Sequence, residues 1–150
     1  MSMITTTTEA ETAIAQVADL IEQLRGVVER ETALVQAGQV RKATALGPAK
    51  SELAARLSTS AERLKANAKF LLRAAPAAAA GLNRLQETFR PVLQKNMTVL
   101  ATAHAVSEGI VRRLSGDLAR KASPQVYGAT GRTLAPNPKH GKPLAISRTL

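Results

Sequence analysis

Few side chains in this sequence of 150 residues have the types and spacing that catalysis or metal binding requires. The two histidines, His104 and His140, lie far apart, and we expect no carboxylate near either one. We interpret both as solvated or packed side chains, with a metal site as the alternative. Because the chain has no cysteine, disulfides, thiolate zinc sites and cysteine nucleophiles are excluded.

Two glycine-containing stretches match nucleotide-binding loops only in part. A phosphate loop needs glycine directly before its lysine and another glycine five residues earlier, but Ala49 precedes Lys50 and Thr44 takes the earlier position. Residues 128–132, GATGR, lack the dinucleotide glycine spacing and a preceding strand. No serine, histidine and acid arrangement is evident. The sequence therefore predicts no enzyme, with no catalytic residue, cofactor or metal.

One polar residue interrupts a long apolar pattern in the second half of the chain. Asn96 occupies a core-like heptad position, where asparagine fixes helix register or partner choice at some cost in stability. The alternative is an amide bonded to solvent or to a neighbouring helix. The pattern predicts a helix over residues 82–120 and comprises Leu82, Leu85, Phe89, Val92, Asn96, Val99, Ala103, Val106, Ile110, Leu114 and Leu118.

Two earlier helices are expected to position this third one. The spacing of Ile14, Val17, Leu20, Ile21 and Leu24 predicts a helix over residues 9–37, capped near Thr8. A second helix is predicted over residues 48–75, because proline suits a first helical turn and Pro76 stops the pattern.

The breaks between the first two helices predict a reversal of the chain. Gly38 can adopt the left-handed conformation that ends a helix, and Val40, Ala43 and Leu46 fit a short helix before the next break. The second helix can then return antiparallel to the first. Pro91 is expected to bend the third helix or to delay its start.

These elements predict an all-α fold: an antiparallel helical hairpin with a long third helix, forming a three-helix, coiled-coil-like bundle. Aromatic residues make up only 2% of the chain, which argues against a β-sandwich or barrel. We expect a helical domain over residues 1–121. Residues 122–150 are rich in proline and glycine and contain no acidic residue, so a flexible basic tail is expected there.

The charge of the chain is uneven. Residues 1–60 carry six basic and seven acidic side chains, whereas residues 61–150 carry fifteen and four, for a net charge of +10 overall. Nucleic acid, an anionic membrane surface and an acidic protein are all compatible partners. The N-terminal residues lack a secretory signal pattern, and no apolar run reaches about 18 residues, so we expect a soluble, cytoplasmic protein without stable membrane insertion.

A set of residues in fixed order resembles FlgN-type flagellar export chaperones. Asn96 and the apolar helix after it are similar to that family's third helix, and YGATGR at residues 127–132 is similar to its C-terminal tyrosine and glycine motif. The first hairpin is matched by Glu31, Ala33, Leu34, Gly38, Leu46, Lys50 and Leu53. The chain departs from the family's pattern at Gln39, where aspartate is common in the family, and at the prolines Pro48 and Pro91.

The resemblance implies a cytoplasmic chaperone for type III protein export in bacterial flagellum biogenesis. Such a chaperone binds hook-associated (hook-filament junction) proteins through their C-terminal helical segments, prevents their premature association and delivers them to the flagellar export gate. It also implies that the motif containing Tyr127, Gly128 and Gly131 docks on that gate. The alternative for Tyr127 is that its ring covers the end of the third helix.

The third helix carries apolar residues in addition to those of its main apolar stripe. This surplus favours binding of an amphipathic partner helix. The alternative is that this helix only completes the bundle within the chain. The predicted client-binding residues are Leu93, Leu100, Val106, Ile110, Val111 and Leu114.

Two other functions are compatible with the charge. A helical nucleic-acid-binding protein would use the basic second half, but the basic residues are dispersed and aromatic stacking platforms are absent, so we expect no nucleic-acid partner. An amphipathic protein coating granules or membrane surfaces would use alanine-rich helices, but the stripes are narrow and the first helix is slightly acidic.

Overall fold

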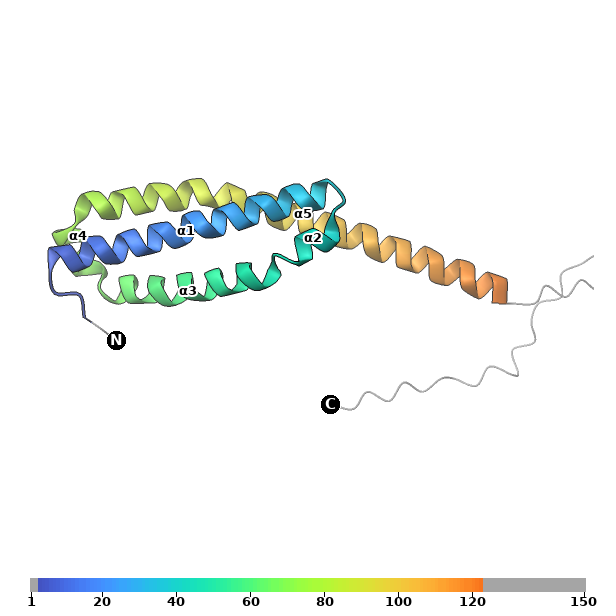
Figure 1. Cartoon of the computed structure of the whole chain (residues 1–150), viewed down its shortest axis with the longest axis horizontal. Coiled ribbons are helices and arrows are strands. Elements are labelled where there is room, and N and C mark those ends of the chain that lie inside the picture. Colours follow the sequence, from blue (N-terminus) through green and yellow to red (C-terminus); the bar gives the residue numbers. More distant parts are fainter. Residues whose placement is uncertain (1–2, 123–150) are drawn as a thin grey trace, which may run out of the picture. The chain divides into compact units, whose positions relative to one another are not determined.

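The computed structural model describes residues 3–122, and its regular structure is entirely helical (Figure 1). The predicted all-α class is confirmed. The helices are α1 (Thr7–Gln36), α2 (Val40–Thr44), α3 (Gly47–Ala66), α4 (Ala68–Ala74) and α5 (Pro76–Ala122).

The first helix begins two residues earlier than the sequence pattern predicted. Thr6, rather than Thr8, is the N-cap: its hydroxyl accepts a hydrogen bond from the Glu9 amide, and the Glu9 carboxylate accepts one from the Thr6 amide at 3.0 Å. This reciprocal pair needs glutamate three residues after the cap, a spacing that both Thr6 and Thr8 have, and the structure uses Thr6 with Glu9. The buried face of α1 consists of Ala10, Ala13, Ile14, Val17, Leu20, Ile21, Leu24, Val28, Glu31 and Thr32.

Gly38 ends the first helix as predicted, with a φ of 73°. The Gln39 amide donates to the Leu34 carbonyl at 2.8 Å, and the Gly38 amide donates to the Val35 carbonyl at 3.0 Å. This pair of bonds is the Schellman motif, which satisfies carbonyls that the helix end would leave free. The chain then enters the short α2, and Pro48 lies in the first turn of α3, both as expected.

The second predicted helix, residues 48–75, is wrong as a single element, because Asn67 separates α3 from α4. The Asn67 carbonyl oxygen Oδ1 accepts from the Ile4 amide at 3.1 Å, and its Nδ2 donates to the Arg63 carbonyl at 2.8 Å. Ile4 itself is buried in the core. The break therefore fixes the N-terminal segment against the α3–α4 junction.

The third helix starts at Pro76, six residues before its predicted start at residue 82. The alanines after Pro76 are strong helix formers, and proline is favoured in a first turn. Pro91 lies inside α5 and does not delay it. Proline cannot donate to the Glu87 carbonyl one turn earlier, but both residues are exposed, so water can satisfy that oxygen.

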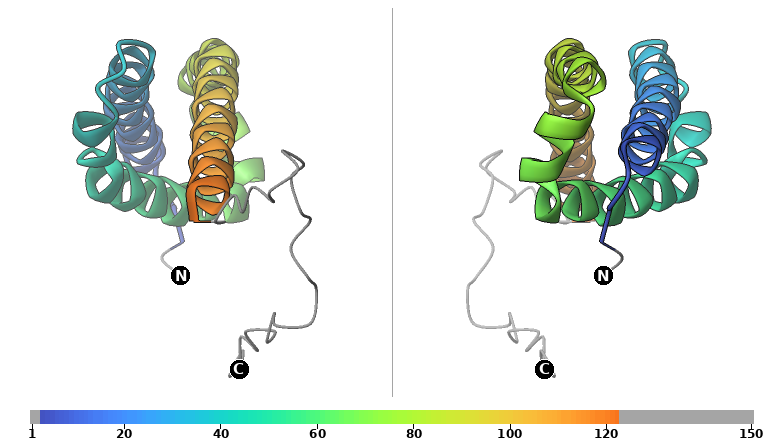
Figure 2. Two further views of the ribbon diagram at one scale, coloured as in Figure 1. Left: turned by 90° about the vertical axis from the view of Figure 1, so that its right-hand side faces the viewer. Right: turned by 90° about the vertical axis from the view of Figure 1, so that its left-hand side faces the viewer.

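The structure divides into two units, Met1–Glu108 and Gly109–Leu150. In the first unit, α1, α3 and the early part of α5 lie side by side, and α4 joins α3 to α5 (Figures 1 and 2). The apolar core is centred on α1, with Leu64, Leu71 and Phe89 contributed by α3, α4 and α5. In the second unit, the described residues are 109–122, the last part of α5.

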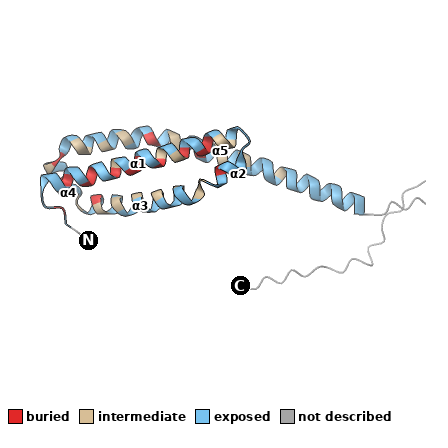
Figure 3. Ribbon diagram, viewed as in Figure 1, coloured by how far each residue is buried: buried red, intermediate tan, exposed pale blue. Residues whose placement is uncertain are grey.

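The two parts of α5 differ in burial (Figure 3). Phe89 and Asn96 are buried, whereas residues 97–122 include no buried side chain. Among residues 3–122, no helix combines the length and the apolar character that crossing a membrane requires.

Candidate functional site

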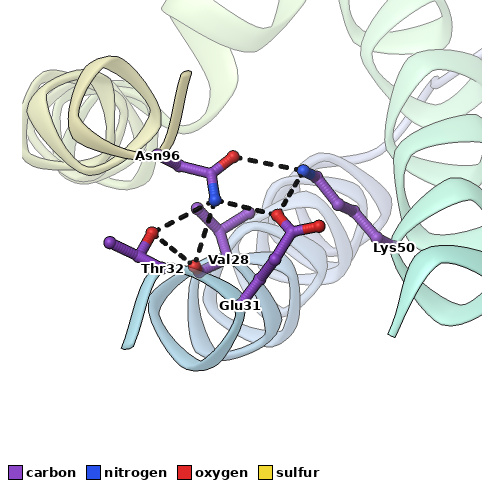
Figure 4. A network of polar contacts seen from close by, with 5 residues as sticks. All are labelled: Val28, Glu31, Thr32, Lys50 and Asn96. Carbon is purple, nitrogen blue, oxygen red and sulfur yellow. Dashed lines mark hydrogen bonds and ion pairs between the residues drawn. The ribbon is translucent and has the colours of Figure 1, made fainter. Parts of the chain in front are cut away.

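A cluster of polar side chains is buried within the first unit. Glu31 and Thr32 come from α1, Lys50 from α3 and Asn96 from α5 (Figure 4). Asn96 is only 2% exposed, and Glu31 and Thr32 are also buried. Helical spacing on α1 places these two residues at the end of its apolar stripe, where they face the other two helices.

Lys50 and Glu31 form the ionic centre of this polar cluster. The Lys50 ammonium lies 2.6 Å from the Glu31 Oε2 atom and 3.1 Å from the Asn96 Oδ1 atom. The side chain of Lys50 remains 28% exposed, against 10% for that of Glu31, so the lysine reaches into the cluster from its edge. One cation thus contacts groups from two other helices.

The Asn96 amide completes the polar cluster. Its Nδ2 atom lies 2.8 Å from the Glu31 Oε2 atom and 3.1 Å from the Thr32 hydroxyl, with the Val28 carbonyl at 3.5 Å. Thr32 also donates to the Val28 carbonyl at 2.9 Å. In this orientation the Asn96 Oδ1 atom faces the ammonium and the Nδ2 atom faces the carboxylate. A flipped amide would place two donors against each other at Lys50 and two acceptors at Glu31.

This arrangement is suited to fixing helix register rather than to catalysis. The side chains of the polar cluster are bonded to one another, and no nucleophile among them lies beside a free base. A buried ion pair adds little net stability compared with apolar packing, but removal of one partner is costly. Any shift of α5 along α1 would separate Asn96 from Glu31, so we interpret the polar cluster as a register lock.

A groove of about 470 Å³ lies directly beside the polar cluster, and Glu31 lines one side of it. Its walls come from the end of α1, from α2 and from the middle of α5. The apolar residues that line this groove are Val35, Val40, Ala43, Leu100, Ala103 and Val106. Val40 and Val106 are both more than half exposed, so the groove is open to a partner.

The predicted client-binding residues fall into three environments. Leu93 packs against the core, Leu100 and Val106 line the groove, and three further residues belong to the second unit. Those three, Ile110, Val111 and Leu114, are each more than half exposed. Four of the six predicted residues, Val106 included, are thus accessible to a partner.

Sequence reasoning missed the α2 wall of the groove. The sequence pattern places Val40 and Ala43 only in a connecting helix. The available signal was Val40, an apolar residue two positions after the helix-ending Gly38. Leu118 belongs to the predicted pattern of the third helix but not to the predicted client-binding residues, and it is also exposed, at 67%.

The expectation that His104 lacks a carboxylate neighbour is wrong. Its Nε2 atom lies 3.2 Å from the Glu108 Oε1 atom, because helical spacing of four residues brings the two side chains together. No group of histidine and acidic residues within residues 3–122 could hold a metal ion. His140, Tyr127, Gly128 and Gly131 lie outside the described residues.

Comparisons with known proteins add no identity to this geometry. No protein-family model, curated protein or solved structure matches the chain.

Proposed function

We propose that the protein is a cytoplasmic flagellar type III export chaperone of the FlgN type. It binds hook-associated proteins through their C-terminal helical segments, keeps those segments from associating early and delivers the proteins to the export gate. In this proposal the α1–α3 hairpin and α5 act as a three-helix, coiled-coil-like bundle that presents the binding surface.

The observation that carries the proposal is the exposed apolar stripe of α5. In the second unit, the exposed large apolar residues are Ile110, Val111, Leu114 and Leu118, each more than half exposed. Steps of four residues from Ile110 to Leu114 to Leu118, and of three from Val111 to Leu114, place them on one side of a helix. Large apolar side chains gathered in this way mark an interaction surface. A partner helix with its own apolar stripe would bury them, and full burial of each anchor contributes about 1.5–3 kcal/mol.

The polar cluster supports the proposal. Glu31, Lys50 and Asn96 are widely separated in sequence, and all three belong to the pattern that resembles the family. They contact one another directly in the fold. A chaperone that holds a client on α5 needs α5 in one register, and a buried asparagine is a known device for this purpose.

Delivery is assigned to the segment beyond the described residues. We propose that Tyr127, Gly128 and Gly131 dock on the export gate. Tyr127→Ala should then leave the helical circular dichroism signal and client affinity unchanged, while gate binding and client secretion decrease together. Loss of client binding with intact gate binding would contradict this role.

Co-expression with candidate hook-associated proteins tests the proposal directly. Each candidate is expressed with and without its C-terminal segment, and complexes are isolated in low and high salt. A complex that requires the segment and survives high salt supports helix binding. A complex only with nucleic acid that dissociates steeply with salt, or flotation with lipid vesicles alone, would instead support one of the rival functions.

A further inference from the structure

We propose that the groove between α2 and α5 is a docking site for one amphipathic helix whose apolar face is flanked by acidic residues. This inference rests on the proposed function, since it takes the occupant to be a client helix. It adds the location of the site, the contribution of α2 and the charge of the partner.

The shape of the groove fits the apolar face of a helix. Val40 and Ala43 on α2 are three residues apart, as are Leu100 and Ala103 on α5, so each wall presents successive turns of a helix. Side chains of a partner at positions i, i+3, i+4 and i+7 would enter between these walls. The Schellman turn at Gly38 places Val40 opposite α5. The break between α1 and α2 therefore has a role in binding.

The charges beside the groove select the occupant. Arg41 and Lys42 follow Val40 directly, and both are exposed on a helix without an acidic residue. Among the described residues, neither forms an ion pair. Of the nearby acids, Glu31 is paired with Lys50, whereas Glu108 contacts His104, which is charged only when protonated, so one carboxylate opposes the two cations Arg41 and Lys42. The uncompensated charge next to the apolar walls is therefore positive, which favours a helix with acidic flanks.

The test uses two synthetic helical peptides of about 18 residues, roughly five turns, that share a leucine stripe and differ only in glutamate or lysine flanks. Binding to the full chain is measured by fluorescence anisotropy. We expect the glutamate peptide to bind severalfold more tightly at about 50 mM salt, and the difference to shrink at about 500 mM, where exposed charges are screened. The double substitution Arg41→Glu and Lys42→Glu should reverse the preference, whereas Arg30→Glu on α1 should not.

Matched variants locate the site. Val40→Asp and Val106→Asp should each weaken glutamate-peptide binding by about tenfold or more, because a charge would enter the apolar groove. Ala105→Asp introduces the same charge one residue away, at an exposed position that does not line the groove, and should have little effect. Circular dichroism checks that each variant keeps its helical signal.

The outcomes separate the groove from the proposed function. No peptide binding, a preference for lysine flanks, or equal binding by Val40→Asp and the unaltered chain would each overturn the groove. Binding of anionic phosphatidylglycerol vesicles that Val40→Asp abolishes, without peptide binding, would also overturn it. If hook-associated proteins co-purify while the peptides fail, only the groove is wrong. If the peptide binds as expected while no hook-associated protein co-purifies, the groove stands and the client assignment is wrong.

Discussion

The two parts of α5 use the same apolar spacing with opposite results. Between Pro76 and Asn96, the apolar side chains pack against α1, α3 and α4, and Phe89 is buried. From residue 97 to residue 122, the spacing continues, but large apolar side chains such as Ile110 and Leu114 are exposed. Hydrophobic periodicity therefore indicates that a helix has an apolar face, but it does not indicate what covers that face.

The polar cluster lies at the boundary between these two parts. Asn96 is the last buried residue of α5, and the groove begins with Leu100 one turn later. The packed part of α5 thus ends at an asparagine that forms a specific set of hydrogen bonds. Beyond it, the apolar face is available to another molecule.

The largest expected effect tests whether the two parts differ in stability. Phe89→Ala removes a buried aromatic side chain and should lower the free energy of unfolding by about 3–5 kcal/mol. Leu114→Ala, on the same helix, removes an exposed side chain and should change it by less than about 0.5 kcal/mol. Urea unfolding followed by circular dichroism measures both. Similar losses for the two variants would show that residue 114 is covered in solution.

The next effect concerns the polar cluster. Lys50→Ala leaves the buried Glu31 carboxylate without its cation and should cost about 2–3 kcal/mol, less than for a fully buried pair because Lys50 is partly exposed. The triple variant Glu31→Leu, Lys50→Met and Asn96→Leu should restore or raise stability, since apolar groups replace the side chains that bond between helices while Thr32 keeps its bond to the Val28 carbonyl.

If the polar cluster sets register, the triple variant should nevertheless bind clients more weakly than the unaltered chain. Stability and client affinity would then change in opposite directions. Unchanged client affinity in a stable triple variant would contradict the register role.

The sequence predicted the local features of this fold better than the long-range ones. The α1 stripe and the Gly38 turn depend on neighbouring residues, so periodicity and backbone preference were sufficient. The break at Asn67 depends on Ile4, which is 63 residues away, and no local pattern specifies that contact. For the same reason, Asn96 could be assigned to the core from its heptad position, but its partners Glu31 and Lys50 could not be identified from spacing.

The groove was harder to predict than the stripe that forms one of its walls. Leu100 and Val106 belong to a visible helical pattern, whereas α2 is only five residues long and shows no repeat. Which face of so short a helix turns toward α5 depends on the turn before it. The position of Val40 in the groove therefore depends on the left-handed conformation of Gly38.

A smaller effect is expected at that turn. Gly38→Val should destabilise the first unit by about 1–2 kcal/mol, because a β-branched residue is strained at the φ of 73°. An added Cβ atom would meet nothing within 4 Å, so the expected effect comes from backbone strain. Gly116→Ala lies in the exposed part of α5 and should instead stabilise its helix by about 0.5–1 kcal/mol. Thermal melting that is unchanged in Gly38→Val would contradict the left-handed assignment.

The smallest effect tests whether the start of α1 shares in the stability of the packed unit. The pKa of the Glu9 carboxyl is lowered because it accepts hydrogen bonds from the backbone amides of Thr5 and Thr6 and from the Thr5 hydroxyl. Since the folded pKa lies below the unfolded value of about 4.3, this group stabilises the fold above that value, and the contribution is lost as the pH falls through the folded pKa.

Glu9→Gln should therefore lower the melting temperature slightly at neutral pH and by less at acidic pH, because the carboxyl becomes protonated in both states as the pH falls through the folded pKa. Glu11→Gln is the control, because Glu11 is also exposed near the start of α1 but is not part of the cap. Melting is followed by circular dichroism at both pH values. If the packed helices unfold together, the small loss at neutral pH moves the entire transition of the first unit. A Glu9→Gln variant that frays only locally, with the main transition unmoved, would show that this end of α1 unfolds separately from the core around Phe89.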